Sequence, residues 1–365
     1  MHEQRVLIIG LGKEFGGVES FIQKTCQGLI EHGYHFDFLT YYDISKLTQD
    51  KIKLLGSKIY KVERYSKNPL HFIREIKEFY RKHTEYSIVH CEASHASMIL
   101  YTFPIWFNKN RKIVFHSHNS SGNHKGLQRW MRLLVNLMAD RRLACSQKAS
   151  NWMFGRKKST IIYNGIETSK FKYNEKLRCD LRQKFHAEEA TVIGHIGRFE
   201  KQKNHRFLIE IFIEVVKKND QMILMLIGDG ELKEDIKDLV QINDLDNKVI
   251  FLPFQDNIED YYSMMDIFVL PSLFEGFPLV GVEAQTAGLP CYFSDNITKE
   301  IAITDLAHFV CNKKAAADWA EEILKSIELI GSDRTQYADI VGNAFDIDET
   351  IEKISQVYCE LEAIK

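Results

Sequence analysis

The fold is decided by the segment from 271 to 290, which reads PSLFEGFPLVGVEAQTAGLP. The apolar run Ile267–Leu270 precedes it and predicts a buried strand that ends at Pro271. Pro278 then predicts the start of a helix, because its fixed φ and missing N–H suit a first-turn position. A strand, a polar loop and a helix in this order are typical of one βα unit of a parallel sheet.

This unit positions two glutamates. Glu275 falls just before the predicted helix start, and Glu283 lies on the helix with seven residues between them. The backbone amides of 276–280 are expected to attract an anion or sugar hydroxyls. An isolated pair of glutamates is more often an N-cap-like acid and a solvated helix residue. The strand, glycine loop and proline-started helix around this pair favour a ligand site instead.

Short β-branched runs alternate with amphipathic stretches along the rest of the chain, as in parallel sheets covered by helices. In the first half the predicted strands are 5–10, 35–41, 58–62, 87–91, 112–116, 141–145 and 160–163. In the second half they are 191–196, 222–227, 248–252, 266–270 and 290–294. After these only helical patterns are predicted, roughly 314–330, 334–345 and 349–364.

The length of 365 residues exceeds what one hydrophobic core usually organises. We therefore predict an α/β protein with two Rossmann-like, doubly wound parallel-sheet domains that face each other across a cleft. The N-terminal domain is 1–166, a polar linker with a short helix is 167–189, and the C-terminal domain is 190–346. The last helix, about 347–365, is expected to pack back on the first domain. Ligands should bind at the carboxyl ends of the strands.

The two halves differ in charge. Residues 1–170 carry 27 Lys and Arg against 14 Asp and Glu, a net charge of +13, whereas the remainder carries 21 against 36, or −15. The first half is therefore expected to face an anionic partner, such as a phosphorylated acceptor or a membrane surface. Its basic residues are scattered and accompany no recognised nucleic-acid motif, so we predict no nucleic-acid partner.

Cysteines and hydropathy bound the location of the protein. The seven cysteines are widely spread and form no CxxC pair, which argues against a disulfide framework or a zinc ribbon. The start of the chain is typical of a first strand and not of a signal peptide, and no apolar run approaches the length of a membrane span. We expect a cytoplasmic protein.

Two loops of the second half follow predicted strands. The first reads GRFEKQKN from 197 to 204 and brings Arg198 and Lys203 to the end of a strand, where they could neutralise a diphosphate. Taken alone, such a loop is as often a solvated turn. The second, GDGEL at 228–232, is as consistent with a structural turn as with a ligand contact.

The first half offers a glycine loop and a histidine pair. Gly16 and Gly17 precede a predicted helix over 18–30, and glycine there allows close approach of a phosphate or sugar. Their spacing from Gly10 and Gly12 does not fit the dinucleotide fingerprint GxGxxG, so NAD binding is disfavoured. In HSHN at 116–119 the two imidazoles project to one face of an extended chain. No third ligand at a diagnostic spacing supports a metal, and His118 is more plausibly a cleft histidine that hydrogen-bonds a sugar or phosphate.

A further amphipathic stretch, KGLQRWMRLLVNLMADRR, runs from 125 to 142. Its apolar stripe consists of Trp130, Leu133, Leu134, Leu137 and Met138. Packing in the core explains such a stripe in most proteins. A basic, Trp-bearing helix that lies on anionic lipid is the alternative.

Taken together, these segments resemble the GT4 family of retaining GT-B glycosyltransferases, in particular its bacterial capsule and exopolysaccharide branch. The resemblance covers nearly the whole chain, and its most specific part is the E-x7-E element. The matching motifs are GGVE at 16–19, HSHN at 116–119, NGIE at 164–167, GRFEKQKN at 197–204, GDGEL at 228–232 and the segment 271–290.

The resemblance implies a role for each matching residue. Arg198 and Lys203 would grip the donor diphosphate, Glu283 would bond the ribose, and Glu275 would hold hydroxyls of the donor sugar. Catalytic residues would thus be Glu275, His118, Arg198 and Lys203. Donor-binding residues would also include Glu283, Gly16 and Gly17, together with the helix-start residues Gly276, Phe277, Pro278, Leu279 and Val280. Phe277 stands where a smaller apolar residue is commoner, which could bear on donor choice.

The implied activity is transfer of a hexose or N-acetylhexosamine from a nucleotide diphosphate sugar, with a UDP-sugar favoured, to a polyprenyl-diphosphate-linked saccharide. The setting would be capsule, exopolysaccharide or O-antigen synthesis at the inner face of the cell membrane, where the basic N-terminal domain would meet anionic lipid. We predict no metal and no cofactor, since fixed cations and oriented amides can stabilise the leaving diphosphate. A nucleotide-sugar epimerase of the same fold and a non-catalytic glycosyltransferase-like partner protein remain alternatives.

Overall fold

The structure is a computed structural model that describes residues 4–13, 16–119, 125–329 and 333–363, without the side chains of 125, 328, 329 and 343. The chain forms two compact units. Unit 1 is Met1–Gly165 together with Ile347–Lys365, and unit 2 is Ile166–Asp346. The predicted linker 167–189 is thus part of unit 2.

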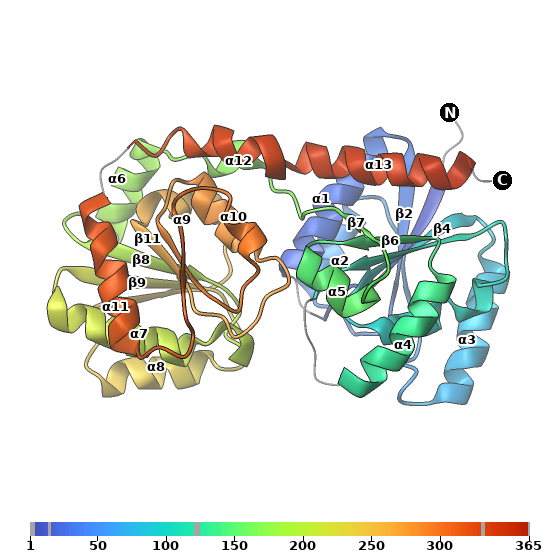
Figure 1. The fold of residues 1–365 in the computed structure, drawn as a ribbon, viewed down its shortest axis with the longest axis horizontal. Helices are drawn as coiled ribbons and strands as arrows, with labels where there is room; N and C mark the ends of the chain where they lie inside the picture. The colour runs from blue at the N-terminus through green and yellow to red at the C-terminus, as the bar shows by residue number, and fades with distance from the viewer. Residues whose placement is uncertain (1–3, 14–15, 120–124, 330–332, 364–365) are drawn as a thin grey trace. The chain divides into compact units, whose positions relative to one another are not determined.

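Unit 1 is built on a seven-stranded sheet in the order β3-β2-β1-β4-β5-β6-β7, and every pairing in it is parallel (Figure 1). The strands are β1 (Gln4–Ile9), β2 (Tyr34–Thr40), β3 (Ile59–Lys61), β4 (Tyr86–Ala93), β5 (Lys112–Ser117), β6 (Arg141–Ala144) and β7 (Thr160–Ile161). The helices are α1 (Gly17–Glu31), α2 (Lys46–Lys53), α3 (Pro69–Lys82), η1 (Ala96–Tyr101), η2 (Phe103–Ile105), α4 (Lys125–Met138), α5 (Gln147–Phe154) and α13 (Ile347–Ala363). All seven predicted strands of this half are present.

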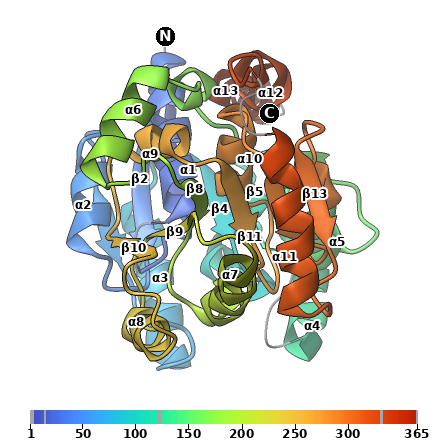
Figure 2. The ribbon, with the colours of Figure 1, turned by 90° about the vertical axis from the view of Figure 1, so that its left-hand side faces the viewer.

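Unit 2 repeats this plan with a six-stranded parallel sheet in the order β10-β9-β8-β11-β12-β13. Its strands are β8 (Thr191–Ile196), β9 (Met222–Ile227), β10 (Val249–Leu252), β11 (Ile267–Leu270), β12 (Cys291–Ser294) and β13 (Ala307–Val310). Its helices are η3 (Thr168–Phe171), α6 (Glu175–Lys184), η4 (Lys201–Lys203), α7 (His205–Lys218), α8 (Lys233–Ile242), α9 (Ile258–Met264), α10 (Leu279–Thr286), η5 (Lys299–Ile301), α11 (Ala316–Lys325), η6 (Ser326–Leu329) and α12 (Tyr337–Phe345). Figure 2 shows α7 and α11 side by side next to the sheet.

The prediction of helices alone after residue 294 is wrong, because β13 adds a sixth strand at the edge of the sheet. This strand is only four residues long and three of them are half-buried, so it carries no apolar run to mark it. The predicted helix over 314–330 is α11 continued by η6, and its last residue lies outside the described part. Likewise the predicted end of the last helix, at 364, lies outside the described residues.

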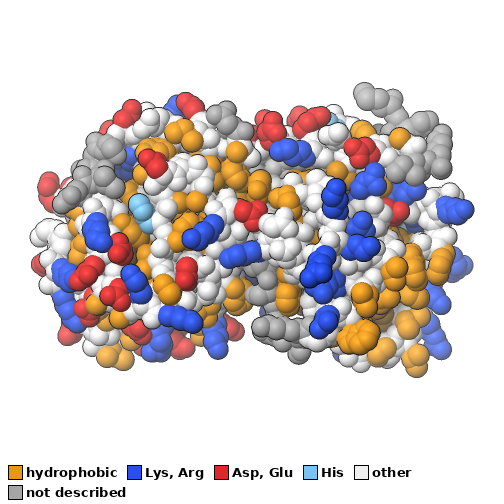
Figure 3. Space-filling model, in the orientation of Figure 1, with side chains coloured by type: hydrophobic (Ala, Val, Ile, Leu, Met, Phe, Trp, Pro, Cys, Tyr) orange, Lys and Arg blue, Asp and Glu red, His pale blue; other side chains and the backbone are white. Residues whose placement is uncertain are grey.

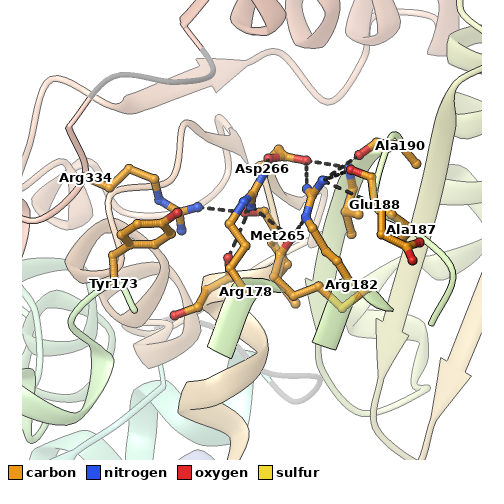
Figure 4. A network of polar contacts seen from close by, with 12 residues as sticks. Tyr173, Arg178, Arg182, Ala187, Glu188, Ala190, Met265, Asp266 and Arg334 are labelled. Carbon is orange, nitrogen blue, oxygen red and sulfur yellow. Dashed lines mark hydrogen bonds and ion pairs between the residues drawn. The ribbon is translucent and has the colours of Figure 1, made fainter. Parts of the chain in front are cut away.

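The segment 167–189 belongs to unit 2 because two of its arginines pair with Asp266, the residue before β11 (Figure 4). Arg178 lies 2.5 Å from one carboxylate oxygen, and Arg182 ion-pairs with the other. Arg334 completes the cluster by donating to the carbonyls of Met265, Tyr262 and Ala287 at 2.8–2.9 Å. A carboxylate this deeply buried is stable only when its lone pairs are satisfied in this way. Figure 4 shows the three guanidinium groups converging on the start of β11.

The last helix, α13, packs against α1 of unit 1. At Gly28 on α1, an added Cβ would lie 2.2 Å from Cδ1 of Ile351, so the missing side chain leaves the space that Ile351 fills. His90 on β4 contacts the Tyr358 hydroxyl at 2.6 Å. Among the described residues, no helix combines the length and the hydropathy needed to cross a bilayer.

Candidate active site

The site in unit 2 lies at the carboxyl ends of β8 and β11. These strands are neighbours at the point where the strand order reverses, with β9 and β10 on one side and β12 and β13 on the other. The connections that leave them diverge to opposite faces, which opens a crevice at that sheet edge. The loop 197–204 follows β8 and the loop 271–278 follows β11, so the fold brings the two predicted motifs together.

Lys203 and Glu275 meet in this crevice. The Lys203 Nζ lies 2.7 Å from Glu275 Oε1, and the Gln202 amide donates to Oε2 at 3.1 Å. The backbone fixes the two loops as well, since the Leu273 amide donates to the Gln202 carbonyl at 2.8 Å. Both charged side chains are largely buried, with 17% and 9% of their surface exposed. The pair is therefore a positioned charge couple and not a solvated surface contact.

Arg198 lies outside this couple. Its guanidinium is 3.2 Å from Glu200 and the side chain is half-exposed. The structure thus brings together Lys203, Gln202 and Glu275 but leaves Arg198 at the rim. Gln202 was missed from the sequence, because a glutamine between two lysines shows no pattern until its distant partner is known.

The turn GDG at 228–230 packs against the start of the loop that carries Lys203. An added Cβ at Gly228 would lie 2.2 Å from the Gly197 carbonyl oxygen, and one at Gly230 would lie 2.7 Å from the Phe199 backbone. The Phe199 amide donates to the Asp229 carbonyl at 2.9 Å. Of the two interpretations offered by the sequence, the structural turn is sufficient to explain these glycines, which let 228–230 press against the Lys203 loop.

Helix α10 presents its N-terminus beside Glu275. Pro278 is its N-cap and Leu279 is its first helical residue. The helix thus begins one residue later than the sequence predicted. Amides in the first turn of a helix point out of its N-terminal end and favour an anion there. Glu283 lies on this helix and accepts from the Tyr262 hydroxyl at 2.6 Å. Tyr262 is a second partner that the sequence did not reveal.

Phe277 is buried and has an interior contact. Its ring stacks on Phe345 with centroids 5.5 Å apart and planes at 11°. The side chain thus ties the glutamate loop to the end of α12 in unit 2.

Unit 1 has a corresponding crevice, between β1 and β4. Gly10 ends β1, and an added Cβ there would lie 2.1 Å from the Glu92 carbonyl oxygen, so glycine is required. The Glu19 carboxylate accepts from the Gly12 amide at 2.8 Å and holds the glycine loop to α1. Gly16 is the N-cap of α1 and Gly17 its first residue, with open space where a Cβ would stand at Gly17.

Glu92 is the centre of a buried histidine cluster in unit 1. Its Oε2 lies 2.6 Å from His118 Nε2 and 3.3 Å from His116 Nδ1, and its Oε1 lies 3.5 Å from His90 Nε2. Each of the four side chains is at most 5% exposed. Phe21 of α1 packs on His118 with ring centroids 5.3 Å apart, which links the cluster to the helix after the glycine loop.

The histidines of this cluster titrate differently. Burial lowers the pKa of His116 to about 4, and His118 reinforces that shift. Burial also opposes charge on His118, but contacts with Cys145 and Glu92 outweigh it and raise the pKa of His118 to about 10. The Glu92 carboxyl has a pKa well below its usual range, because the neighbouring histidines overcome the effect of burial. At neutral pH the cluster is therefore an imidazolium–carboxylate pair flanked by neutral imidazoles.

Three members of this cluster have a set of atoms that could hold a metal ion. His90, Glu92 and His116 each offer a ligand atom within 4.8 Å of the others. The sequence analysis found no third ligand for the two histidines of HSHN because His90 and Glu92 come from a different strand. Whether the protein works without a metal, as predicted, stays a prediction.

Comparison with known proteins agrees with the two-unit division. Residues 179–340 match the family described as glycosyl transferases group 1, and residues 15–170 match the one described as glycosyltransferase family 4. These two glycosyltransferase family models together match most of the chain, one in each half. EpsF of Bacillus subtilis is 29% identical to it over 338 residues, which cover 89% of this chain and 88% of EpsF. The family and the fold support transferase activity.

A second relative, from Escherichia coli, is named UDP-Gal:alpha-D-GlcNAc-diphosphoundecaprenol alpha-1,3-galactosyltransferase. It is 26% identical over 212 residues, or 56% of this chain and 54% of its own.

Solved structures show the same fold over whole chains. Anabaena HepE in complex with UDP superposes with a TM-score of 0.82 at 18% identity, covering 98% of this chain and 100% of its own. Sucrose-phosphate synthase from Thermosynechococcus elongatus gives 0.79 at 18% identity, covering 99% and 100%. The predicted GT-B class, with two doubly wound parallel-sheet domains, is confirmed.

Proposed function

We propose that the protein is a retaining glycosyltransferase that moves a hexose or N-acetylhexosamine from a UDP-sugar to a lipid-linked saccharide. The observation that carries this proposal is the Lys203–Glu275 couple at the carboxyl ends of β8 and β11. A diphosphate oxygen can take the place of the carboxylate at Lys203 Nζ, and Glu275 can then accept hydrogen bonds from sugar hydroxyls. When the contact between Lys203 and Glu275 is replaced by these two contacts, the diphosphate and the sugar of the donor are both bound.

The other donor contacts follow from the same elements. Glu283, oriented by Tyr262, would accept from the ribose hydroxyls, and the first-turn amides of α10 would face the phosphates. Arg198 is half-exposed and its pair with Glu200 costs little to break, so it can add a second cation to the diphosphate. Fixed positive charge stabilises the leaving nucleoside diphosphate as its bond to the sugar breaks. We propose that no metal is needed for this step.

Unit 1 would receive the acceptor. Residues 1–170 have a net charge of +13, which favours a diphosphate-linked substrate and an anionic membrane surface. The glycine loop at Gly16 and Gly17 and the imidazolium of His118 would approach the transferred sugar. The relative from Escherichia coli supports this class of acceptor, since its name states a diphosphoundecaprenol-linked sugar. Capsule, exopolysaccharide or O-antigen synthesis is the proposed setting.

Thermal shift with a panel of UDP- and GDP-sugars is the first test. A donor at about 100 times its dissociation constant should stabilise the protein by ~2.7 kcal/mol. The selected donor is then incubated with undecaprenyl-diphosphate-linked N-acetylglucosamine, with and without EDTA. Product with the donor's anomeric configuration in both reactions is expected. If no nucleotide shifts the transition, the proposed donor class is refuted. An inverted anomer would refute the retaining mechanism, and loss of transfer in EDTA would refute the proposal that no metal is needed.

A further inference from the structure

Helix α4 turns its apolar side outward. Among its residues Leu127, Trp130, Leu133 and Leu137 are exposed, by 47%, 73%, 54% and 67%. They recur at helical spacing and so form one face, here called the α4 face. The prediction that this stripe packs in the core is therefore wrong for Trp130, Leu133 and Leu137, although Met138 at the end of the helix is buried.

The opposite side of the same helix packs inward, and Val135 and Met138 are buried there together with Gln128. Gln128 is buried, with its side-chain oxygen accepting from the Ala96 amide at 2.8 Å. Asn136 donates to the Phe154 carbonyl at 3.1 Å, and the Arg132 guanidinium lies against Gly155. A helix on an ordinary water-exposed surface is apolar only on the side that packs on the core, whereas α4 is apolar on its outer side as well. The hydrogen bonds of Gln128 and Asn136 help to hold α4 with Trp130, Leu133 and Leu137 outward.

Apolar exposure continues beside α4. Helix η1 packs against α4, and the chain that continues from it exposes Phe103 by 49% and Phe107 by 82%. Helix α3, which contacts η2, exposes Leu70 by 75%. Figure 3 shows hydrophobic side chains gathered over the part of unit 1 that holds α3 and α4, with Lys and Arg side chains next to them. Exposed apolar surface of this extent is typical of an interaction site.

The charges along the segment that holds α4 and α5 are mostly positive. From 126 to 158 the sequence has a single acidic residue, Asp140. Against it stand eight basic residues: Arg129, Arg132, Arg141, Arg142, Lys148, Arg156, Lys157 and Lys158. The last three directly follow α5, which packs against α4. Apolar side chains flanked by cations match a layer whose surface is anionic and whose interior is hydrocarbon.

We propose that the α4 face docks unit 1 on an anionic lipid bilayer, with Trp130, Leu133 and Leu137 entering the boundary between headgroups and acyl chains. This inference rests on the proposed function in one respect, since a lipid-linked acceptor places the reaction at a membrane. We expect lipid and not a second copy of the chain to cover the α4 face, because the basic residues beside α4 would repel their own copies across a two-fold interface. The helix lies in the plane of the surface and does not cross the bilayer.

Vesicle co-sedimentation tests the proposal without donor or acceptor. The protein should bind vesicles of phosphatidylcholine and phosphatidylglycerol in equal amounts, and bind phosphatidylcholine alone far more weakly. Leu133→Glu with Leu137→Glu should weaken binding by roughly tenfold or more, since two apolar insertions are lost. Ile242→Glu is the matched control, because Ile242 is 78% exposed on unit 2, and it should bind as the unsubstituted protein does. Trp130 fluorescence should shift to the blue on binding, and Trp130→Phe should abolish most of that shift.

Three outcomes would overturn the docking surface: no binding to the anionic vesicles, equal binding by the double variant, or a dimer in solution that the double variant converts to monomer. A UDP thermal shift on each variant separates the two proposals. The double variant should keep the shift of the unsubstituted protein, because its changes are exposed and lie on unit 1. If the protein binds vesicles but no nucleotide stabilises it, the α4 face is a membrane-binding surface and the proposed function is wrong.

Discussion

Strand β11 is flanked by two buried carboxylates, one before it and one after it, whose surroundings differ. Asp266 precedes the strand and is held by Arg178, Arg182 and the Val192 amide, the last at 2.8 Å. Glu275 follows the strand and has Lys203 at 2.7 Å and the Gln202 amide at 3.1 Å. The first carboxylate joins pieces of one domain, whereas the second joins two loops at the sheet edge where ligands bind.

The difference shows that burial and pairing alone do not identify a functional acid. Asp266 lies at the amino end of a parallel strand, where the predicted linker and Arg334 cover it, so no ligand can replace its partners. Glu275 lies at the carboxyl end beside a helix N-terminus, where an incoming anion can compete for Lys203. We therefore expect that the end of the strand decides whether such an ion pair stabilises the fold or, as proposed for Lys203 and Glu275, serves the reaction.

Asp266→Asn should give the largest effect, and the effect should be on stability. Removing one charge leaves two arginines without their buried partner, which costs about 3–5 kcal/mol. Urea unfolding of unit 2, followed by hydrogen exchange of the β8 and β11 amides, measures this loss. Asp220→Asn is the control, because its 2.7 Å pair with Lys248 is exposed and should matter little. Equal losses in both variants would contradict the structural role of Asp266.

Glu275→Gln should lower the activity and leave the stability of the fold nearly unchanged, the opposite of what is expected for Asp266→Asn. Transfer is expected to fall by about 10²–10³-fold while the protein remains folded, since the amide cannot accept sugar hydroxyls as a carboxylate does. Steady-state kinetics with the selected donor measures the change. Glu234→Gln, on the exposed side of α8, should transfer normally. An active, destabilised Glu275→Gln protein would place Glu275 in the same class as Asp266.

Glu92 sharpens the comparison, because it is buried like Asp266 but lies at the carboxyl end of its strand like Glu275. Contacts with Cys145 and Glu92 raise the pKa of His118 from 6.5 to about 10, so these contacts stabilise the fold fully below about pH 6.5 and lose this effect as pH rises through 10. Unit 1 should lose about 3–4 kcal/mol between pH 7 and 10. In Glu92→Gln that slope should flatten, as urea unfolding at each pH would show. An unchanged slope would mean that Glu92 does not hold His118 as an imidazolium.

Tyr262→Phe should give the smallest effect. It removes the hydroxyl that orients Glu283, a hydrogen bond worth about 0.5–1.5 kcal/mol. The dissociation constant for UDP should rise by roughly three- to tenfold, which calorimetry can measure. Tyr261→Phe removes a neighbouring hydroxyl that donates to Gln255 at 3.0 Å, and it should leave UDP binding unchanged. The same loss of affinity in both variants would argue against a specific role for Glu283.

The sequence predicted those parts of the molecule that depend on neighbours along the chain. Twelve predicted strands correspond to observed ones, Glu275 and Glu283 have the expected placement around α10, and the start of this helix was predicted to within one residue. Errors arose where distant residues decide. The predicted linker folds into unit 2 because Arg178 and Arg182 reach Asp266, which no local pattern shows.

The site was incomplete in sequence for the same reason. Gln202, Tyr262 and Glu92 become partners of predicted residues only when separate strands align. Lys203 could be identified from its motif, but its contact with Glu275 required the order of β8 and β11. Helix α4 shows the opposite case, since its apolar period was visible but the side that faces outward was not.

The return of α13 to unit 1 has a consequence for biosynthesis. Residues 347–363 are translated after unit 2, yet Ile351 packs against Gly28 and Tyr358 contacts His90 within the first unit. A ribosome must therefore complete all of unit 2 before unit 1 has its full set of contacts. Domains usually mature in the order of synthesis. In this chain the second domain can fold first, and the first remains incomplete until α13 has been translated.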